Sequence, residues 1–105
     1  MNARKPELKL RTRQFARRVV RLYIALPLRR AEVAVLGKQM LRSGTSVAAN
    51  YREASRARSR NEFVSKIEPC AQEADETQLW LELLRDDCGI ALPELSDIYG
   101  VKRMS

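Results

Sequence analysis

The sequence predicts an all-α protein: an antiparallel up-and-down four-helix bundle whose fourth helix is short or incomplete. Three long stretches carry apolar residues at alternating spacings of three and four, the pattern of helices with one buried face. Short segments separate these stretches, as is usual between antiparallel neighbours. Only four glycines and four prolines occur, which disfavours a turn-rich β fold. At 105 residues, the chain forms one domain, residues 1–105, with a single modest core.

The first helix is expected over residues 8–26, after a flexible basic tail at residues 1–7. Its core stripe recurs at spacings of four, three and four: Phe15, Val19, Leu22 and Leu26. Pro27 cannot continue a helix and marks its end. Val20 and Ile24 lie off the core stripe and would be unusual on a free surface, so they are candidates for packing against another subunit.

The second helix is expected over residues 31–57. Its apolar residues keep a seven-residue rhythm in which Gly44 fills one slot: Val33, Leu36, Met40, Val47 and Tyr51. Gly37 and Gly44 each cost about 1 kcal/mol of helix propensity relative to alanine. Close packing of another backbone at these glycines would explain them, and a local bend at Ser43–Gly44 is the alternative.

The third helix is expected over residues 60–87, opened by a capping box in which Ser59 and Glu62 bond reciprocally. Pro69 predicts a kink near residues 66–69. Gly89 ends this helix, and a short fourth helix is expected over residues 93–99. The core seam alternates four and three: Phe63, Ile67, Cys70, Ala74, Thr77, Leu81, Leu84 and Cys88. A second apolar face favours burial by a fourth helix or an oligomer interface: Leu79, Trp80 and Leu83.

Charge is distributed unevenly within the net +7. Residues 1–60 hold 16 basic and 3 acidic residues, whereas residues 61–105 hold 4 basic and 10 acidic residues. A solvated helix face is one explanation, and a phosphate-contacting surface or head-to-tail contact between subunits are the others. The predicted nucleic-acid-binding residues lie on the first helix and around the turn after the second: Lys9, Arg11, Arg13, Arg17, Arg18, Arg21, Arg52, Arg56, Arg58 and Arg60.

A polar row follows one face of the second helix at spacings of four, four and three: Arg42, Ser46, Asn50 and Glu53. Such a row beside small packing residues indicates a specified contact between helices. Arg42 is expected to form a buried ion pair with Glu73 or Glu76 across the bundle, which would set the register of the helices more than add stability.

The same region resembles the four-helix-bundle family of proteins encoded in intervening sequences of bacterial 23S rRNA genes, and the related accessory proteins of diversity-generating retroelements. The resemblance implies the bundle fold, a ring of five subunits, and a reverse-transcriptase-like protein as a candidate partner. It spans about residues 15–84, and these residues carry it: Gln39, Arg42, Ser43, Ser46, Val47, Ala49, Asn50, Glu53, Ala54, Ser59, Glu62, Phe63, Glu73, Glu76 and Leu81.

Enzymatic chemistry finds little support in the sequence. There is no histidine, which excludes Ser-His and Cys-His catalysis, and no phosphate-binding glycine loop. Cys70 and Cys88 are too few for a structural zinc site and suit a reducing cytoplasm, so no metal or cofactor is expected. No apolar run is long enough for a membrane span.

The sequence therefore predicts a non-enzymatic nucleic-acid-binding adaptor that contacts phosphates of RNA or DNA. The alternative is a structural, oligomeric protein-interaction module with no nucleic-acid role.

Overall fold

The computed structural model describes residues 5–91, and these residues form three α-helices and no strand. The predicted all-α class is confirmed. Helix α1 spans Lys5–Ala25, α2 spans Ala31–Ser55 and α3 spans Arg60–Asp86. The fourth helix expected at residues 93–99 and the first four residues of the expected tail lie outside the described residues. Helix α1 begins three residues before the predicted start, because Pro6 fits a first helical turn, where its missing N–H leaves no bond unmade.

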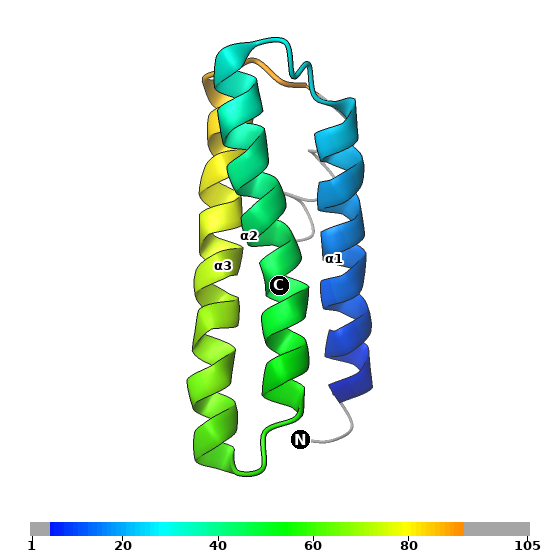
Figure 1. Cartoon of the computed structure of the whole chain (residues 1–105), viewed down its shortest axis with the longest axis vertical. Coiled ribbons are helices and arrows are strands. Elements are labelled where there is room, and N and C mark those ends of the chain that lie inside the picture. The colour runs from blue at the N-terminus through cyan, green and yellow to red at the C-terminus, as the bar shows by residue number, and fades with distance from the viewer. Residues whose placement is uncertain (1–4, 92–105) are drawn as a thin grey trace.

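Helix α2 lies between α1 and α3 and runs antiparallel to both (Figure 1). The Cα atoms of α1 and α3 stay more than 8 Å apart along the described helices. The basic helix and the acidic helix therefore occupy opposite flanks of the molecule, parallel to each other.

Two glycines let α1 pack closely against α2. A Cβ atom built at Gly44 would lie 2.8 Å from both Cγ methyl groups of Val19. One built at Gly37 would lie 2.8 Å from Cδ1 of Leu26. Helix α2 is continuous through both positions, so the glycines serve close approach, in this case of side chains from the neighbouring helix rather than of its backbone.

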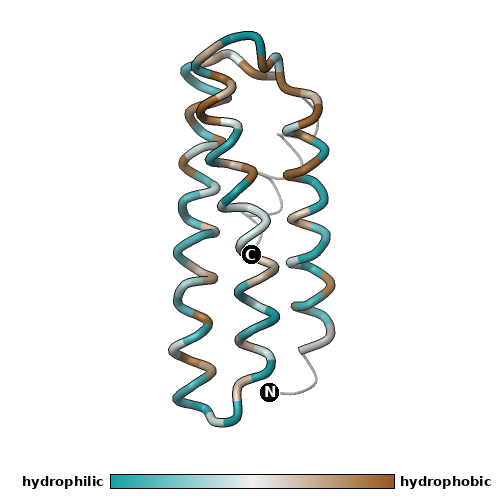
Figure 2. The backbone as a smooth tube through the Cα atoms, in the orientation of Figure 1, coloured by the Kyte–Doolittle hydropathy of each residue, from teal (hydrophilic) through white to brown (hydrophobic). Residues whose placement is uncertain are grey.

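The predicted core stripes face the interior of the bundle: most members are buried, and five are half-buried, namely Phe15, Leu36, Phe63, Ile67 and Ala74. The larger cluster holds apolar residues from all three helices and from the segment after α3: Val19, Leu22, Leu26, Val33, Met40, Leu81, Leu84, Cys88 and Ile90. A smaller cluster toward the α2–α3 turn holds Val47, Tyr51 and Cys70. Figure 2 shows the same gradient, with hydrophobic stretches densest at the end that carries the α1–α2 loop.

Hydrogen bonds of Arg30 connect the α1–α2 loop to the segment after α3 at one end of the bundle. The Arg30 guanidinium donates to the Cys88 carbonyl at 2.8 Å and also binds Glu32 at 2.9 Å. Gly89 adopts φ 71°, a conformation that suits glycine, and this turn lets the Ile90 amide donate to the Leu84 carbonyl at 3.0 Å. The chain thus folds back onto its own core after α3.

The start of α3 differs in one respect from the predicted capping box. The Glu62 amide donates to the Ser59 hydroxyl at 3.1 Å, as expected. The Glu62 carboxylate, however, accepts from the amide of Arg58, one residue before the cap. Helix α3 then continues without interruption through Pro69, which is exposed, so water can reach the Ser65 carbonyl that lacks its helical donor.

Candidate nucleic-acid interface

Four of the ten predicted basic residues come together in one groove between α1 and α2. Arg13, Arg17 and Arg21 follow each other at one-turn intervals on α1, and Arg52 faces them from α2. The groove has a volume of about 460 Å³ and a floor of small or apolar side chains: Ala16, Val20, Ala48 and Ala49. All four arginines are exposed, so their guanidinium groups can meet a ligand in the groove from both walls.

A second hollow of about 700 Å³ lies at the α2–α3 turn. Arg58 and Arg60 line it together with Ser59, Phe63 and Val64. Because α1 runs antiparallel to α2, this turn and the first turn of α1 lie at the same end of the bundle (Figure 1). The groove is lined by Ala48, Ala49 and Arg52 near the end of α2, so both hollows lie toward this end of the bundle.

The remaining predicted basic residues are exposed but line neither hollow: Lys9, Arg11, Arg18 and Arg56. The sequence pattern did not identify Ala16 and Ala48 as groove residues. Small side chains give no chemical signal of their own, and only the packing of α1 on α2 reveals which alanines form a floor.

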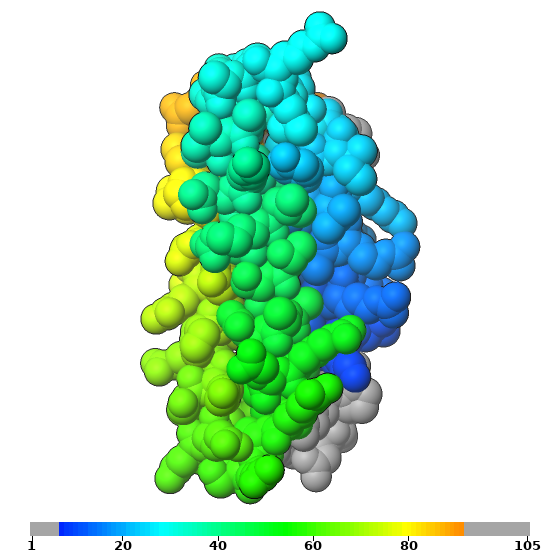
Figure 3. All heavy atoms as spheres, in the orientation of Figure 1, coloured from blue at the N-terminus to red at the C-terminus, as the bar shows by residue number. Residues whose placement is uncertain are grey.

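The electrostatic contrast between the flanks is pronounced. Helix α1 carries seven basic residues and one acidic residue, whereas α3 carries seven acidic and three basic residues. Figure 3 shows the α1 flank (blue) and the α3 flank (yellow-green) on opposite sides of α2. A polyanion is therefore attracted to the α1–α2 side and repelled by the α3 side.

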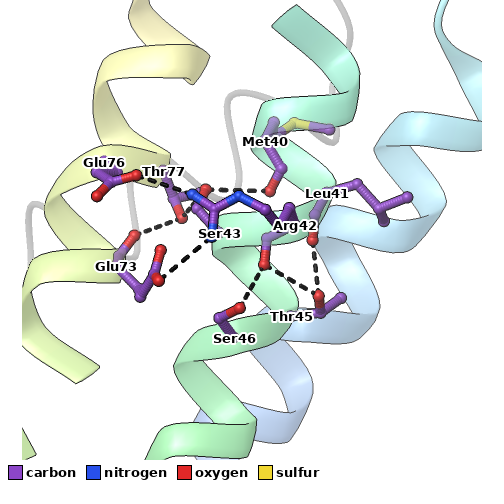
Figure 4. Close-up of polar contacts among 9 residues, drawn as sticks. All are labelled: Met40, Leu41, Arg42, Ser43, Thr45, Ser46, Glu73, Glu76 and Thr77. Atoms are coloured by element: carbon purple, nitrogen blue, oxygen red, sulfur yellow. Dashed lines mark hydrogen bonds and ion pairs between the residues drawn. The ribbon is translucent and has the colours of Figure 1, made fainter. Parts of the chain in front are cut away.

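Arg42 bridges α2 and α3 as predicted. Its guanidinium lies 3.3 Å from Glu73 Oε2 and 3.0 Å from Glu76 Oε1 (Figure 4). The Arg42 side chain is 52% exposed and that of Glu76 is 48% exposed, so the expectation of a buried pair is wrong. The long arginine side chain crosses the helix contact at its rim, where water still reaches the charges.

A buried hydroxyl pair lies beneath this ion pair. The Thr77 hydroxyl is 2.7 Å from the Glu73 carbonyl and 2.8 Å from the Ser43 hydroxyl, and both side chains are fully buried (Figure 4). The Ser43 hydroxyl in turn lies 3.3 Å from the Met40 carbonyl, so each hydroxyl also has a carbonyl acceptor on its own helix. These two hydroxyls form the buried polar contact between α2 and α3 that was expected of Arg42.

The other family-motif residues on α2 make contacts within the bundle or lie at its surface. Ser46 donates to the Arg42 carbonyl at 2.7 Å within α2. Glu53 pairs with Lys66 of α3 at 3.4 Å, an exposed contact that the sequence pattern did not identify. Gln39 is exposed and Asn50 half-buried on α2. The polar row thus follows the α2–α3 seam and lies apart from the basic groove.

Neither cysteine is in a reactive setting. Both thiols are free and buried. Burial raises the pKa of the Cys70 thiol, which disfavours the nucleophilic thiolate. Burial likewise raises the pKa of Tyr51, which packs in the same cluster. Within residues 5–91, no three or more metal-ligating side chains gather, and no helix there carries an apolar stretch of the length that a bilayer requires.

The fold and surface define a small helical bundle with one basic flank and one acidic flank. The family model described as 23S rRNA-intervening sequence protein matches residues 5–99, and the chain belongs to this family. It is also similar to a crystal structure of a protein with unknown function from the S23 ribosomal protein family of Bacteroides thetaiotaomicron. The two share 40% identity over 91% of this chain and 88% of that chain, with a TM-score of 0.79. No curated protein matches the sequence.

Proposed function

We propose that this protein is a non-enzymatic adaptor that binds the phosphate backbone of nucleic acid in the α1–α2 groove. The supporting observation is the convergence of Arg13, Arg17, Arg21 and Arg52 on one hollow. Guanidinium groups bind phosphate oxygens in a bidentate manner, and four of them along two walls suit a chain of phosphates better than a single anion. The second basic hollow, beside Arg58 and Arg60, extends the contact at the same end of the bundle.

The lining of the α1–α2 groove favours backbone contact over base recognition. Its floor is alanine and valine, and no aromatic side chain is among the lining residues. Proteins that read single strands stack bases on aromatic side chains. Binding in this groove is therefore expected to depend on phosphate charge and helix shape, with little sequence preference.

The salt dependence of binding tests the proposal. Neutralising four phosphates of a duplex gives a slope of log K against log salt of about −3.6, so affinity falls roughly 150-fold between 50 and 200 mM salt. Fluorescence anisotropy with labelled duplex DNA and structured RNA measures this slope. Changing Arg17 and Arg21 to glutamine should reduce its magnitude by about 1.8.

The matched control changes Arg29 and Lys38 to glutamine. Both are exposed and lie outside the groove, and the pair removes the same net charge. If the control lowers affinity and slope as much as the groove variant, the arginines act through overall charge and the groove is not the site. If the unmodified protein shows no binding at 50 mM salt, the proposal is rejected.

The second candidate function is an oligomeric protein-interaction module. The opposed charges of the two flanks and the exposed Ile24, at 74% of its accessible area, favour it. The ring of five subunits that the family resemblance implies belongs with this candidate. The reverse-transcriptase-like partner, also implied by the resemblance, accompanies the adaptor proposal, and the cytoplasmic location is proposed from the two free cysteines. If the partner is a protein and not a nucleic acid, binding would still require the groove arginines, but this chain would show no preference for phosphate polymers.

A further inference from the structure

We propose that the hollow at the α2–α3 turn binds an unpaired nucleobase, so that the preferred ligand carries a single-stranded end or loop beside its duplex. This inference rests on the proposed function and deepens it, because it adds a base-binding site to the phosphate-binding groove. The hollow has a volume of about 700 Å³. Two alanines line it together with one aromatic, one branched apolar, one hydroxyl and two basic side chains: Phe63, Val64, Ser59, Arg58 and Arg60.

Phe63 differs from the other aromatic residues of the described chain in its surroundings. Phe15, Tyr23, Tyr51 and Trp80 belong to a buried core cluster or pack against one. Helical periodicity placed Phe63 at the start of the α3 core seam, yet its side chain is outside both clusters, is half-buried and lines the hollow. The ring is thus held by the protein on one side and can be reached by a ligand from the hollow.

The surroundings of this ring suit a nucleobase. A volume of about 700 Å³ is within the usual range of small-molecule pockets. Val64 is 51% exposed and adds apolar surface beside Phe63. Stacking of a base on an aromatic ring tolerates any base, because every base has a flat π face. The Ser59 hydroxyl accepts from the Glu62 amide at 3.1 Å, so its hydrogen can donate to the edge of a stacked base.

The charges at the hollow favour a nucleotide over an uncharged ligand. Arg58 and Arg60 flank Ser59 in the chain, and neither forms an ion pair with another residue of the described range 5–91. The nearby Glu62 carboxylate accepts from the Arg58 amide at 2.6 Å. Two guanidinium groups beside an apolar wall match a flat base between two phosphates, since guanidinium binds phosphate oxygens in a bidentate manner.

The hollow and the groove lie on different sides of α2. Arg52 lines the groove and Ala54 lines the hollow, and residues two positions apart in a helix do not share a face. A ligand that occupies both sites must therefore bend around a helix, which is about 10–12 Å across. Duplex DNA is stiff over about 150 base pairs, whereas a single strand is flexible, so the part of the ligand that reaches the hollow is unpaired.

Fluorescence anisotropy with three matched probes tests the base site. The probes are a short blunt duplex, the same duplex with a short single-stranded tail, and the same duplex with a tail of abasic nucleotides. The two tails carry equal numbers of phosphates, so they separate base stacking from charge. The tail with bases should bind at least roughly fivefold more tightly than the abasic tail, the lower end of the effect of one stacked base. Equal affinity for the two tails would overturn the inference.

Variants of Phe63 test the stacking partner. Phe63→Leu keeps an apolar side chain without the ring and should remove the preference for the tail with bases, whereas Phe63→Trp should keep it. Binding of this tail should also quench the fluorescence of Phe63→Trp and leave that of the unmodified protein unchanged, because Trp80 packs against the core. Thermal unfolding by circular dichroism identifies any variant that fails to fold. Absence of quenching in folded Phe63→Trp would refute stacking in the hollow.

The base site and the phosphate groove fail separately. Tight binding of the blunt duplex with no gain from either kind of tail would reject the base site and leave the groove proposal in place. An apolar side chain of a protein partner as the true occupant of the hollow would give this result. Binding of the tail that depends on Phe63, with no binding of the blunt duplex at 50 mM salt, would support the hollow and reject the groove. Binding of none of the probes would reject both.

Discussion

Replacement of Gly44 by alanine tests the contact that fixes α1 on α2. The added Cβ would lie 2.8 Å from both Cγ atoms of Val19 and 3.1 Å from its Cβ. Rotation of the valine cannot relieve the clash, because both of its methyl groups are too close and the side chain is fully buried. The helices must separate, and overpacking of this kind costs up to about 3 kcal/mol.

Helix propensity offsets part of that cost. Alanine is favoured over glycine by about 1 kcal/mol in a helix interior, so the net loss of unfolding free energy for Gly44→Ala is about 2 kcal/mol. For a domain of this size, the loss corresponds to a decrease in Tm of roughly 10 °C. Circular dichroism during thermal and urea unfolding measures both quantities.

Gly37→Ala is the matched comparison. Its Cβ would come within 2.8 Å of Cδ1 of Leu26, the flexible end of one side chain, and Tyr23 lies at an ordinary 3.5 Å. A small rotation of the leucine removes the clash, so the propensity gain should leave this variant neutral or more stable by up to about 1 kcal/mol. Equal Tm values for the two alanine variants would refute the account of α1 packing at Gly44.

Three further predictions concern the α2–α3 contact. Ser43→Ala or Thr77→Val alone should each cost about 1 kcal/mol of unfolding free energy, because each removes the hydrogen bond between the two hydroxyls while the remaining hydroxyl keeps a carbonyl of its own helix as partner, and the double variant should be less destabilised than the sum of the two because both changes remove the same bond. Arg42→Met should cost only about 1 kcal/mol in urea unfolding, since the ion pair is half exposed, and a loss above 3 kcal/mol would show that the pair is buried in solution. Burial raises the pKa of Cys70 and of Tyr51, so the stability that they contribute is present below their unfolded pKa values. For Cys70, this stability declines as pH rises above about 8.5. Cys70→Ala should flatten the decline in urea unfolding between pH 8 and 10.5, and an unchanged slope would contradict the prediction.

Helical periodicity identified which face of each helix is buried. The seam that includes Cys70, Thr77 and Leu84 is buried because residues at spacings of three and four share a face whatever their chemistry. The sequence also predicted the partners of Arg42, because its long, charged side chain pairs with carboxylates of the facing helix. Its exposure could not, because that depends on how deep in the seam the helices place the position.

The sequence did not predict which of the basic residues line the groove. Ten basic residues share the same charge and a similar exposure, and nothing in their spacing says which of them meet Arg52 on another helix. The deciding residues are Ala48 and Ala49, which are small enough to let α1 and its arginines form a wall beside α2. Such a surface arises from the contact between helices and belongs to neither helix alone.

The row of like charges on α1 destabilises the helix, a cost that a surface serving only solubility would not need. Lys9, Arg13, Arg17 and Arg21 follow one another at four-residue intervals, so three neighbouring pairs repel each other within one helix. Each such pair destabilises a helix by about 0.2–0.5 kcal/mol, or roughly 1 kcal/mol together. Interspersed acidic residues would give the same solubility without this cost, and α1 has only Glu7. A row of phosphates placed against α1 turns the repulsion into attraction, which is why the proposed function assigns a negatively charged ligand to this flank.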